Sequence, residues 1–200
     1  KKLLIGASAL VILIIITLVS YNIVQANNPV PEKTSLISIQ KDIDKKISTY
    51  GYTFDNPNII LNPYEISPLT ALIAFETKSP EIITITIKGK DKLTTYSHTF
   101  DKTDKHYIPV YGLYPNYNNE IIIKSETKEK VINIKTEPLP EDFILPTNIT
   151  KKEEYLTNEL YFYTPSSKGY TCAYDTNGDV RWYLTKNFIW EISRLKNGHL

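Results

Sequence analysis

Apolar and polar residues follow two different periodicities along this chain, and the change falls near residue 50. Between residues 34 and 49 the apolar positions, among them Leu36, Ile43 and Ile47, form one stripe at helical spacing with charged residues between them. This pattern predicts an amphipathic helix that packs on the domain behind it. A membrane-lying or dimer-forming helix is the alternative.

After Gly51 the apolar period shortens to two, as in Ile83, Ile85 and Ile87, which alternate with polar residues. Turn signals separate the resulting candidate strands, which are Asn58–Leu61, Thr70–Lys78, Ile82–Lys88, Leu93–Phe100, His106–Tyr111, Glu120–Glu126 and Val131–Thr136. Short strands with frequent turns predict a two-sheet β-sandwich of the immunoglobulin or fibronectin III type over residues 50–136.

A proline-containing stretch, residues 137–158, is expected to link this sandwich to a second region, residues 159–200. The second region contains candidate strands at Leu160–Tyr163, Gly169–Tyr174, Val180–Leu184 and Phe188–Leu195. Four consecutive short strands are typical of one β-propeller blade, and a lone blade would leave its faces unburied. We therefore expect residues 159–200 to be the incomplete start of a propeller.

A hairpin signal stands inside this blade. Asn177-Gly178 lies between two strand-like runs and predicts a type I′ turn, in which both residues have a positive φ. Asp175, Asn177 and Asp179 also have the alternate spacing of calcium ligands. Because Gly178 and Lys186 do not fit the glycine and glutamate positions of a calcium loop, the hairpin is favoured.

The N-terminus resembles a targeting segment. Lys1 and Lys2 precede an uncharged stretch whose apolar part, Leu3–Val19, approaches the ~20 residues that span a bilayer. Residues 1–26 are predicted to be a signal anchor, favoured by the length of the apolar part, or a signal peptide cleaved after Ala26. Residues 27–49 form a linker and the amphipathic helix. Either reading places the rest outside the cytoplasm, in a single-pass protein of the cell membrane or a secreted one.

The predicted fold class is thus all-β after an N-terminal transmembrane or signal helix. Composition narrows the chemistry. A formal net charge of +1 gives no reason to expect a nucleic-acid partner. Cys172 is the only cysteine, so an internal disulfide and cysteine-based metal clusters are excluded. With only His98, His106 and His199 available as bases, Cys172 is interpreted as a small strand residue and not as a nucleophile. We assign no catalytic, cofactor-binding or metal-binding residue and expect no cofactor.

Aromatic residues near the end of the chain have two interpretations. Cross-strand packing is favoured over an aromatic-substrate pocket for the tyrosines of the second region, which are Tyr161, Tyr163, Tyr170 and Tyr174. Arg181 beside Trp182 could form a cation–π or sulfate-contacting pair, but strand packing with a surface charge is favoured.

Four sequence blocks carry a resemblance to a known family: Tyr50–Pro57, Asn62–Thr77, His106–Pro115 and Tyr174–Leu184. In order and spacing the first three resemble the N-terminal domain of bacterial arylsulfate sulfotransferases. The fourth is similar to the start of that family's propeller. The resemblance covers approximately residues 45–200.

The resemblance implies a β-sandwich followed by a six-bladed propeller. It implies an enzyme that transfers a sulfuryl group from an aryl sulfate donor to a phenol acceptor without a nucleotide sulfate, through a sulfohistidine. That histidine is expected beyond Leu200, so the chain alone would be inactive, with the sandwich as a scaffold or as the contact of a possible homodimer. The alternatives are a non-enzymatic cell-surface binding or adhesion protein, and an anchored sandwich whose β-tail ends at Leu200.

Overall fold

The computed structural model describes residues 36–166 and 168–185. The chain divides into two compact units, residues 1–44 and 45–200. The predicted targeting segment 1–26, the candidate strand Phe188–Leu195 and His199 lie outside the described residues. Within the described part of the chain, no helix has the length and hydrophobicity needed to cross a membrane.

Helix α2 (Leu36–Tyr50) lies where the helical periodicity predicts it. Ile43 and Ile47, one turn apart, are both buried, whereas Leu36 is 54% exposed. Tyr50 ends the helix because Gly51, with a φ of +59°, adopts the left-handed conformation that commonly follows a helical C-terminus.

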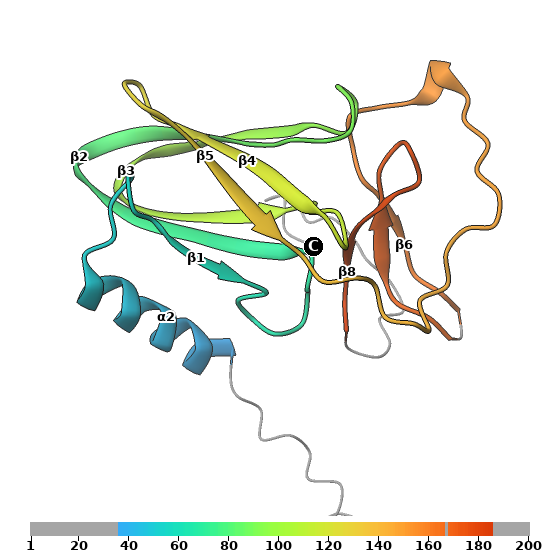
Figure 1. The fold of residues 1–200 in the computed structure, drawn as a ribbon, viewed down its shortest axis with the longest axis horizontal. Helices are drawn as coiled ribbons and strands as arrows, with labels where there is room; N and C mark the ends of the chain where they lie inside the picture. Colours follow the sequence, from blue (N-terminus) through green and yellow to red (C-terminus); the bar gives the residue numbers. More distant parts are fainter. Residues whose placement is uncertain (1–35, 167, 186–200) are drawn as a thin grey trace, which may run out of the picture. The chain divides into compact units, whose positions relative to one another are not determined.

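One antiparallel sheet makes up most of the second unit (Figure 1). Its strands are β1 (Asn58–Leu61), β2 (Thr70–Ile87), β3 (Tyr96–Tyr111), β4 (Asn118–Lys124) and β5 (Glu129–Lys135). β3 pairs with β2 along one edge. β1 and β4 share the other edge of β2, β1 along residues 71–74 and β4 along residues 84–87. β2 is therefore the strand on which the whole sheet is assembled.

The prediction of two packed sheets is wrong, because a single curled sheet takes their place. The predicted strands Thr70–Lys78 and Ile82–Lys88 are one strand, β2, and Ser79-Pro80 is not a turn but lies inside it. The register against β3 shifts between Glu76 and Ile83, which marks a β-bulge or irregularity. Bulges bend a strand and tolerate proline, so the sheet can curl without a chain reversal. Figure 1 shows β2 and β3 curving together.

The alternating isoleucines form the core, as their period predicts. Ile83, Ile85 and Ile87 of the second half of β2 are at most 5% exposed. They belong to the same hydrophobic cluster as Ile73 and Phe75 of the first half. Because the bend brings both halves of one strand around a common interior, the sheet buries its apolar face as two packed sheets would.

A second, three-stranded sheet follows a connecting segment. Its antiparallel strands are β6 (Tyr161–Tyr163), β7 (Cys172–Tyr174) and β8 (Val180–Tyr183), in the order β6-β7-β8. The connecting segment contains a short 3-10 helix, Glu153–Tyr155, and no strand. Three of the four strands expected for a blade are thus present among the described residues.

The β7–β8 hairpin forms, but its turn differs from the predicted type I′. The amide of Gly178 donates to the carbonyl of Asp175 (2.9 Å), and of the Asn177-Gly178 pair only Gly178 has a positive φ, +78°. A turn closed in this way and followed by a left-handed glycine is the three-residue hairpin with a bulge. The Asp175 carboxylate explains the choice, because its Oδ1 accepts the amides of Asn177 (2.9 Å) and Asp179 (3.1 Å).

His106 lies opposite Phe75, at the edge of the bend. The two rings stack at 4.7 Å, and His106 Nε2 lies 3.2 Å from Thr77 Oγ1. Burial lowers the pKa of His106 below its ordinary value of 6.5, although the charges of Glu81 and Asp104 act in the opposite direction.

We therefore predict that His106 makes the fold sensitive to acid. A lowered pKa means that the unfolded chain binds the proton more tightly, so the contribution is complete above pH 6.5 and is lost as the pH falls toward the folded pKa. The urea midpoint should fall more between pH 7.5 and pH 5.5 in the unchanged chain than in His106→Gln. The exposed histidine provides the control: His98→Gln should retain the full fall. Equal falls in all three proteins would contradict the prediction.

Candidate functional site

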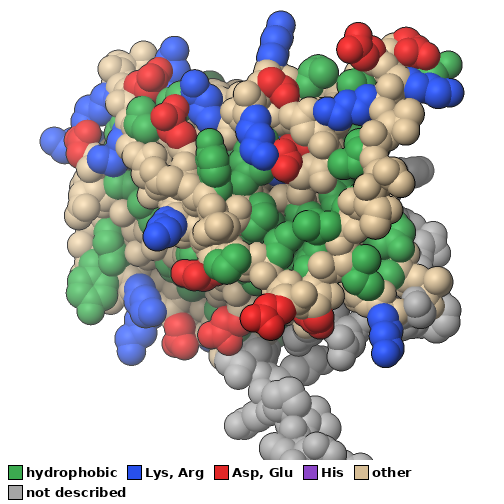
Figure 2. Space-filling model, turned by 45° about the vertical axis from the view of Figure 1, so that its right-hand side comes forward, with side chains coloured by type: hydrophobic (Ala, Val, Ile, Leu, Met, Phe, Trp, Pro, Cys, Tyr) green, Lys and Arg blue, Asp and Glu red, His purple; other side chains and the backbone are tan. Residues whose placement is uncertain are grey.

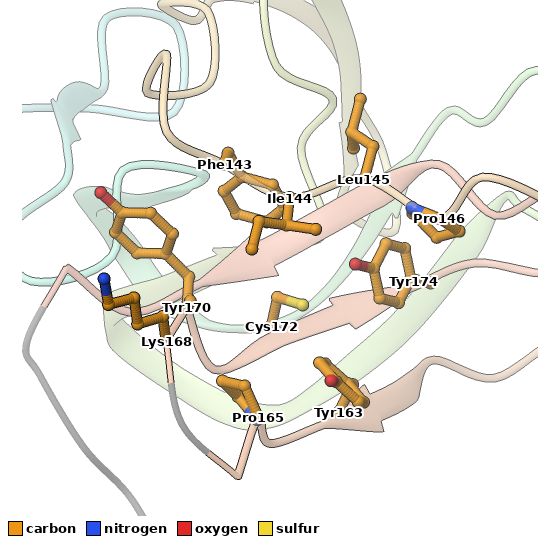
Figure 3. Close-up of a pocket in the computed structure, with 11 residues that line it drawn as sticks. Phe143, Ile144, Leu145, Pro146, Tyr163, Pro165, Lys168, Tyr170, Cys172 and Tyr174 are labelled. Carbon is orange, nitrogen blue, oxygen red and sulfur yellow. The ribbon is translucent and has the colours of Figure 1, made fainter.

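A pocket of about 280 Å³ lies between residues 143–146 of the connecting segment and strands β6 and β7 (Figure 3). Its lining is dominated by aromatic and aliphatic side chains, including those of Phe143, Tyr163, Tyr170 and Tyr174. Small-molecule sites are typically concave and apolar with few polar groups, so this pocket is the candidate site in the described part of the chain.

The aromatic wall of the pocket is held in place by its neighbours. Phe143 and Tyr170 stack almost in parallel (5.2 Å between centroids), and Tyr183 packs edge-on against both. The Tyr170 hydroxyl donates to Asp142 Oδ1 (2.9 Å). This hydrogen bond is the main cause that raises the pKa of Tyr170. The Phe143–Tyr170 pair is therefore held by the packing of its rings and by the hydrogen bond of the Tyr170 hydroxyl to Asp142.

Three of the four tyrosines considered from the sequence line this pocket: Tyr163, Tyr170 and Tyr174. Tyr161 does not line it and instead lies opposite Tyr174 in the β6–β7 register. Cross-strand pairing and pocket lining thus coexist. Strand alternation could not distinguish Tyr161 from Tyr163, because residues two apart on a strand lie on the same face.

Cys172 lies at the pocket between the tyrosines, as Figure 3 shows. It is 1% exposed and opposite Tyr163 in the register. Burial raises the pKa of its thiol, although a hydrogen bond with Tyr174 opposes that change. Burial likewise raises the pKa of Tyr174. A neutral, buried thiol is a poor nucleophile, which agrees with the interpretation of Cys172 as a packed strand residue.

The charged content of the pocket is small. Among the described lining residues only Lys168 carries a charge. Two further lining residues, Ile144 and Leu145, are 68% and 54% exposed. Figure 2 shows hydrophobic side chains gathered over part of the surface, with most charged side chains around them. The site can bind an apolar or aromatic group, but its described residues do not include an acid–base pair.

Neither described histidine contributes to the pocket. His98 lies exposed on β3, where it packs edge-on against Phe100 at 4.7 Å. His106 is buried on the same strand, 2% exposed. Neither is among the residues that line the pocket. No group of three or more potential metal ligands occurs among residues 36–166 and 168–185.

Arg181 corrects the sequence interpretation most clearly. The sequence favours strand packing with a surface charge, but the Arg181 side chain is fully buried and forms an ion pair with Asp175 (Nη1 to Oδ2, 2.9 Å). The guanidinium stacks on Tyr114 (3.7 Å to the centroid) and on Tyr96 (5.0 Å), whereas Trp182 packs against Phe162. Full burial excludes direct contact with a dissolved sulfate. The only signal in the sequence was the placement of one arginine inside an apolar run.

The aspartates of the hairpin are also engaged by protein groups. Asp175 accepts Arg181 and two backbone amides, and Asp179 pairs with Lys90 at 2.7 Å. Asn177 donates to Asp91 Oδ2 at 2.6 Å. These contacts support the hairpin interpretation over the calcium loop.

Comparison with protein families accounts for most of the described chain. Residues 58–137 match the family model of the arylsulfotransferase Ig-like domain, and residues 146–200 match the arylsulfotransferase family model. A comparison with individually curated proteins gave no match.

The geometry predicts that Cys172 is reached only through the pocket. A thiol-reactive maleimide should label the folded chain far more slowly than the chain unfolded in urea, because the sulfur is buried and its pKa is raised. Tyr163→Ala should speed native-state labelling by removing an exposed ring from the pocket. The control Tyr155→Ala removes a ring that is 71% exposed elsewhere and should leave the rate unchanged. Equal rates in both variants would show that the thiol is reached by another route.

Proposed function

The chain belongs to the arylsulfotransferase family, and from this membership we propose that it is the N-terminal part of an enzyme that transfers a sulfuryl group from an aryl sulfate to a phenol. The observation that carries the proposal is the order of the two family matches, an Ig-like domain followed directly by the arylsulfotransferase region. These domains support a sulfotransferase-type function. The donor, the acceptor and the route of the sulfuryl group are part of the proposal.

The proposed chemistry has two steps through a sulfohistidine. A neutral imidazole nitrogen attacks the sulfur, a nitrogen–sulfur bond forms, and the sulfur–oxygen bond to the donor ring breaks to release a phenolate. The acceptor phenol then gives its proton to solvent water and its oxygen attacks the sulfur. The nitrogen–sulfur bond breaks, and its electron pair returns to the imidazole nitrogen, which is neutral again. Cationic neighbours would stabilise the sulfate oxygens in both transition states.

The described residues offer no place for this reaction. The buried cation, Arg181, is already paired with Asp175, and His106 is buried on β3. His98 is exposed on the five-stranded sheet, and it is not among the residues that line the pocket. We propose that the reacting histidine and its cationic neighbours follow Leu200 in a longer protein, in later blades of a propeller that β6, β7 and β8 begin.

We also propose the domain organisation and the location of the longer protein. Residues 1–26 would anchor the protein in the cell membrane or direct its secretion. Residues 50–136 would form the Ig-like domain, residues 137–158 a linker and residues 159–200 the start of the propeller. The catalytic region would lie outside the cytoplasm, where it meets phenolic acceptors and aryl sulfate donors, and a homodimer is a possible assembly.

A sulfotransfer assay tests this function. The full-length protein is incubated with 4-nitrophenyl sulfate and phenol, and release of 4-nitrophenolate is followed together with formation of phenyl sulfate. Both should appear in equal amounts, and residues 1–200 alone should produce neither. Substituting the proposed propeller histidine should abolish transfer.

Two results would overturn the proposal. One is transfer by residues 1–200 alone, which would place the chemistry in the wrong part of the protein. The other is an absence of transfer by a folded full-length protein with no histidine in its later blades, which would favour a non-enzymatic binding or adhesion protein.

A further inference from the structure

We propose that the five-stranded sheet carries a docking surface for the β7–β8 hairpin, and that this contact holds the two parts of the chain together even when the segment connecting them is cut. The docking surface consists of the loop Gly89–Thr95 together with Tyr96, Gly112 and Tyr114. The proposal concerns an interaction within this chain and goes beyond the proposed sulfuryl transfer.

The centre of the contact is the Arg181 guanidinium. Its Nε donates to the carbonyl of Gly112 (2.7 Å), and its Nη1 donates to the carbonyl of Thr94 (3.0 Å) as well as to Asp175. Both carbonyls belong to the docking surface, far from Arg181 in sequence. A buried charge is stable only when it is paired and hydrogen-bonded, so removing the hairpin would leave these carbonyls without their donor.

Two tyrosines of the docking surface enclose this charge. Tyr114 lies 3.7 Å and Tyr96 5.0 Å from the guanidinium carbon, measured to the ring centroids. The Tyr114 hydroxyl also donates to Asp175 Oδ2 (3.1 Å) and accepts the amide of Lys90 (3.1 Å). One side chain of the surface thus contacts both members of the buried ion pair.

Polar pairs surround the centre. Lys90 pairs with Asp179, and Asp91 accepts Asn177, with both contacts partly exposed to solvent. The loop that presents these groups is held by hydrogen bonds of its own: Asp91 Oδ1 accepts the amide of Thr94 (3.0 Å), and the amide of Gly89 donates to Thr95 Oγ1 (2.9 Å).

The loop also requires its glycine, because a Cβ at Gly89 would lie 2.1 Å from the carbonyl oxygen of Thr94. That carbonyl is one of the acceptors of Arg181. The absence of a side chain at Gly89 therefore leaves room for the Thr94 carbonyl, which accepts the hydrogen bond from Arg181.

The apolar core continues across the contact. Cys172, Val180 and Tyr183 of the three-stranded sheet belong to the same hydrophobic cluster as the isoleucines of β2. A buried centre of aromatic and arginine residues with a polar, exposed rim is the anatomy of stable protein–protein interfaces. The connecting segment, in contrast, is exposed over residues 144–155. The contact, and not the covalent link, is what fixes the hairpin on the sheet.

The test is to cut the folded full chain with a protease and to measure whether the two pieces stay bound to each other. A protease recognition sequence is inserted between Glu153 and Glu154, which are exposed. After cleavage, both tryptophans of the chain, Trp182 and Trp190, lie on the smaller piece. A change in tryptophan emission during dilution therefore reports dissociation, and size-exclusion chromatography reports co-elution. The pieces of the otherwise unchanged chain should co-elute. Arg181→Met should raise their dissociation constant by more than about a hundredfold, because it leaves Asp175 buried without its cation.

Two further variants sharpen the outcome. Lys90→Met makes the same change at the exposed rim pair and should alter the dissociation constant by less than about tenfold. Tyr114→Phe keeps the ring but removes the hydroxyl and should weaken association by about tenfold or more, which tests the proposal even where Arg181→Met does not fold. Immediate separation of the unchanged pieces, or equal effects of the rim and centre variants, would overturn the proposal.

Discussion

The buried ion pair between Arg181 and Asp175 is the interaction on which the arrangement of the second unit depends. Transferring both charges from water is costly, and their attraction repays it only with good geometry and further hydrogen bonds. Here the guanidinium reaches two backbone carbonyls, and the carboxylate accepts a hydroxyl and two amides. Removing one partner of such a pair costs about 3–5 kcal/mol, because the other charge stays buried. The pair therefore selects one position of the hairpin more than it adds net stability.

The sequence predicted what depends on local periodicity. Helix α2, the strand β1 and the alternation of Ile83, Ile85 and Ile87 all follow from the spacing of apolar residues. It failed where non-local geometry decides. Ser79-Pro80 resembles a turn, but pairing with β3 on both sides of it keeps the chain in one bent strand. The burial of Arg181 could not be read from its neighbours, because its partners Thr94 and Gly112 are distant in sequence.

The candidate site, like the fold, could be predicted only in part from the sequence. The sequence favours cross-strand packing for the tyrosines on consecutive strands and gives an aromatic pocket only as the alternative, yet Tyr163, Tyr170 and Tyr174 do line a pocket. Phe143 was missed because it comes from the connecting segment, and its stacking on Tyr170 is a tertiary contact. The family matches place this pocket mostly in the arylsulfotransferase region and leave the Ig-like domain with the docking surface. The candidate pocket and the docking surface are thus formed by different residues.

The distance along the chain between the hairpin and its docking surface has a consequence for biosynthesis. Arg181 is separated from Thr94 by 87 residues, so the contact is among the most non-local in the molecule. Such contacts form slowly when both partners must be ordered at once. A ribosome, however, makes residues 89–114 first, and domains fold in the order in which they emerge. The loop and both tyrosines are therefore translated before Arg181, and strands β7 and β8 can fold onto a surface whose residues have already left the ribosome.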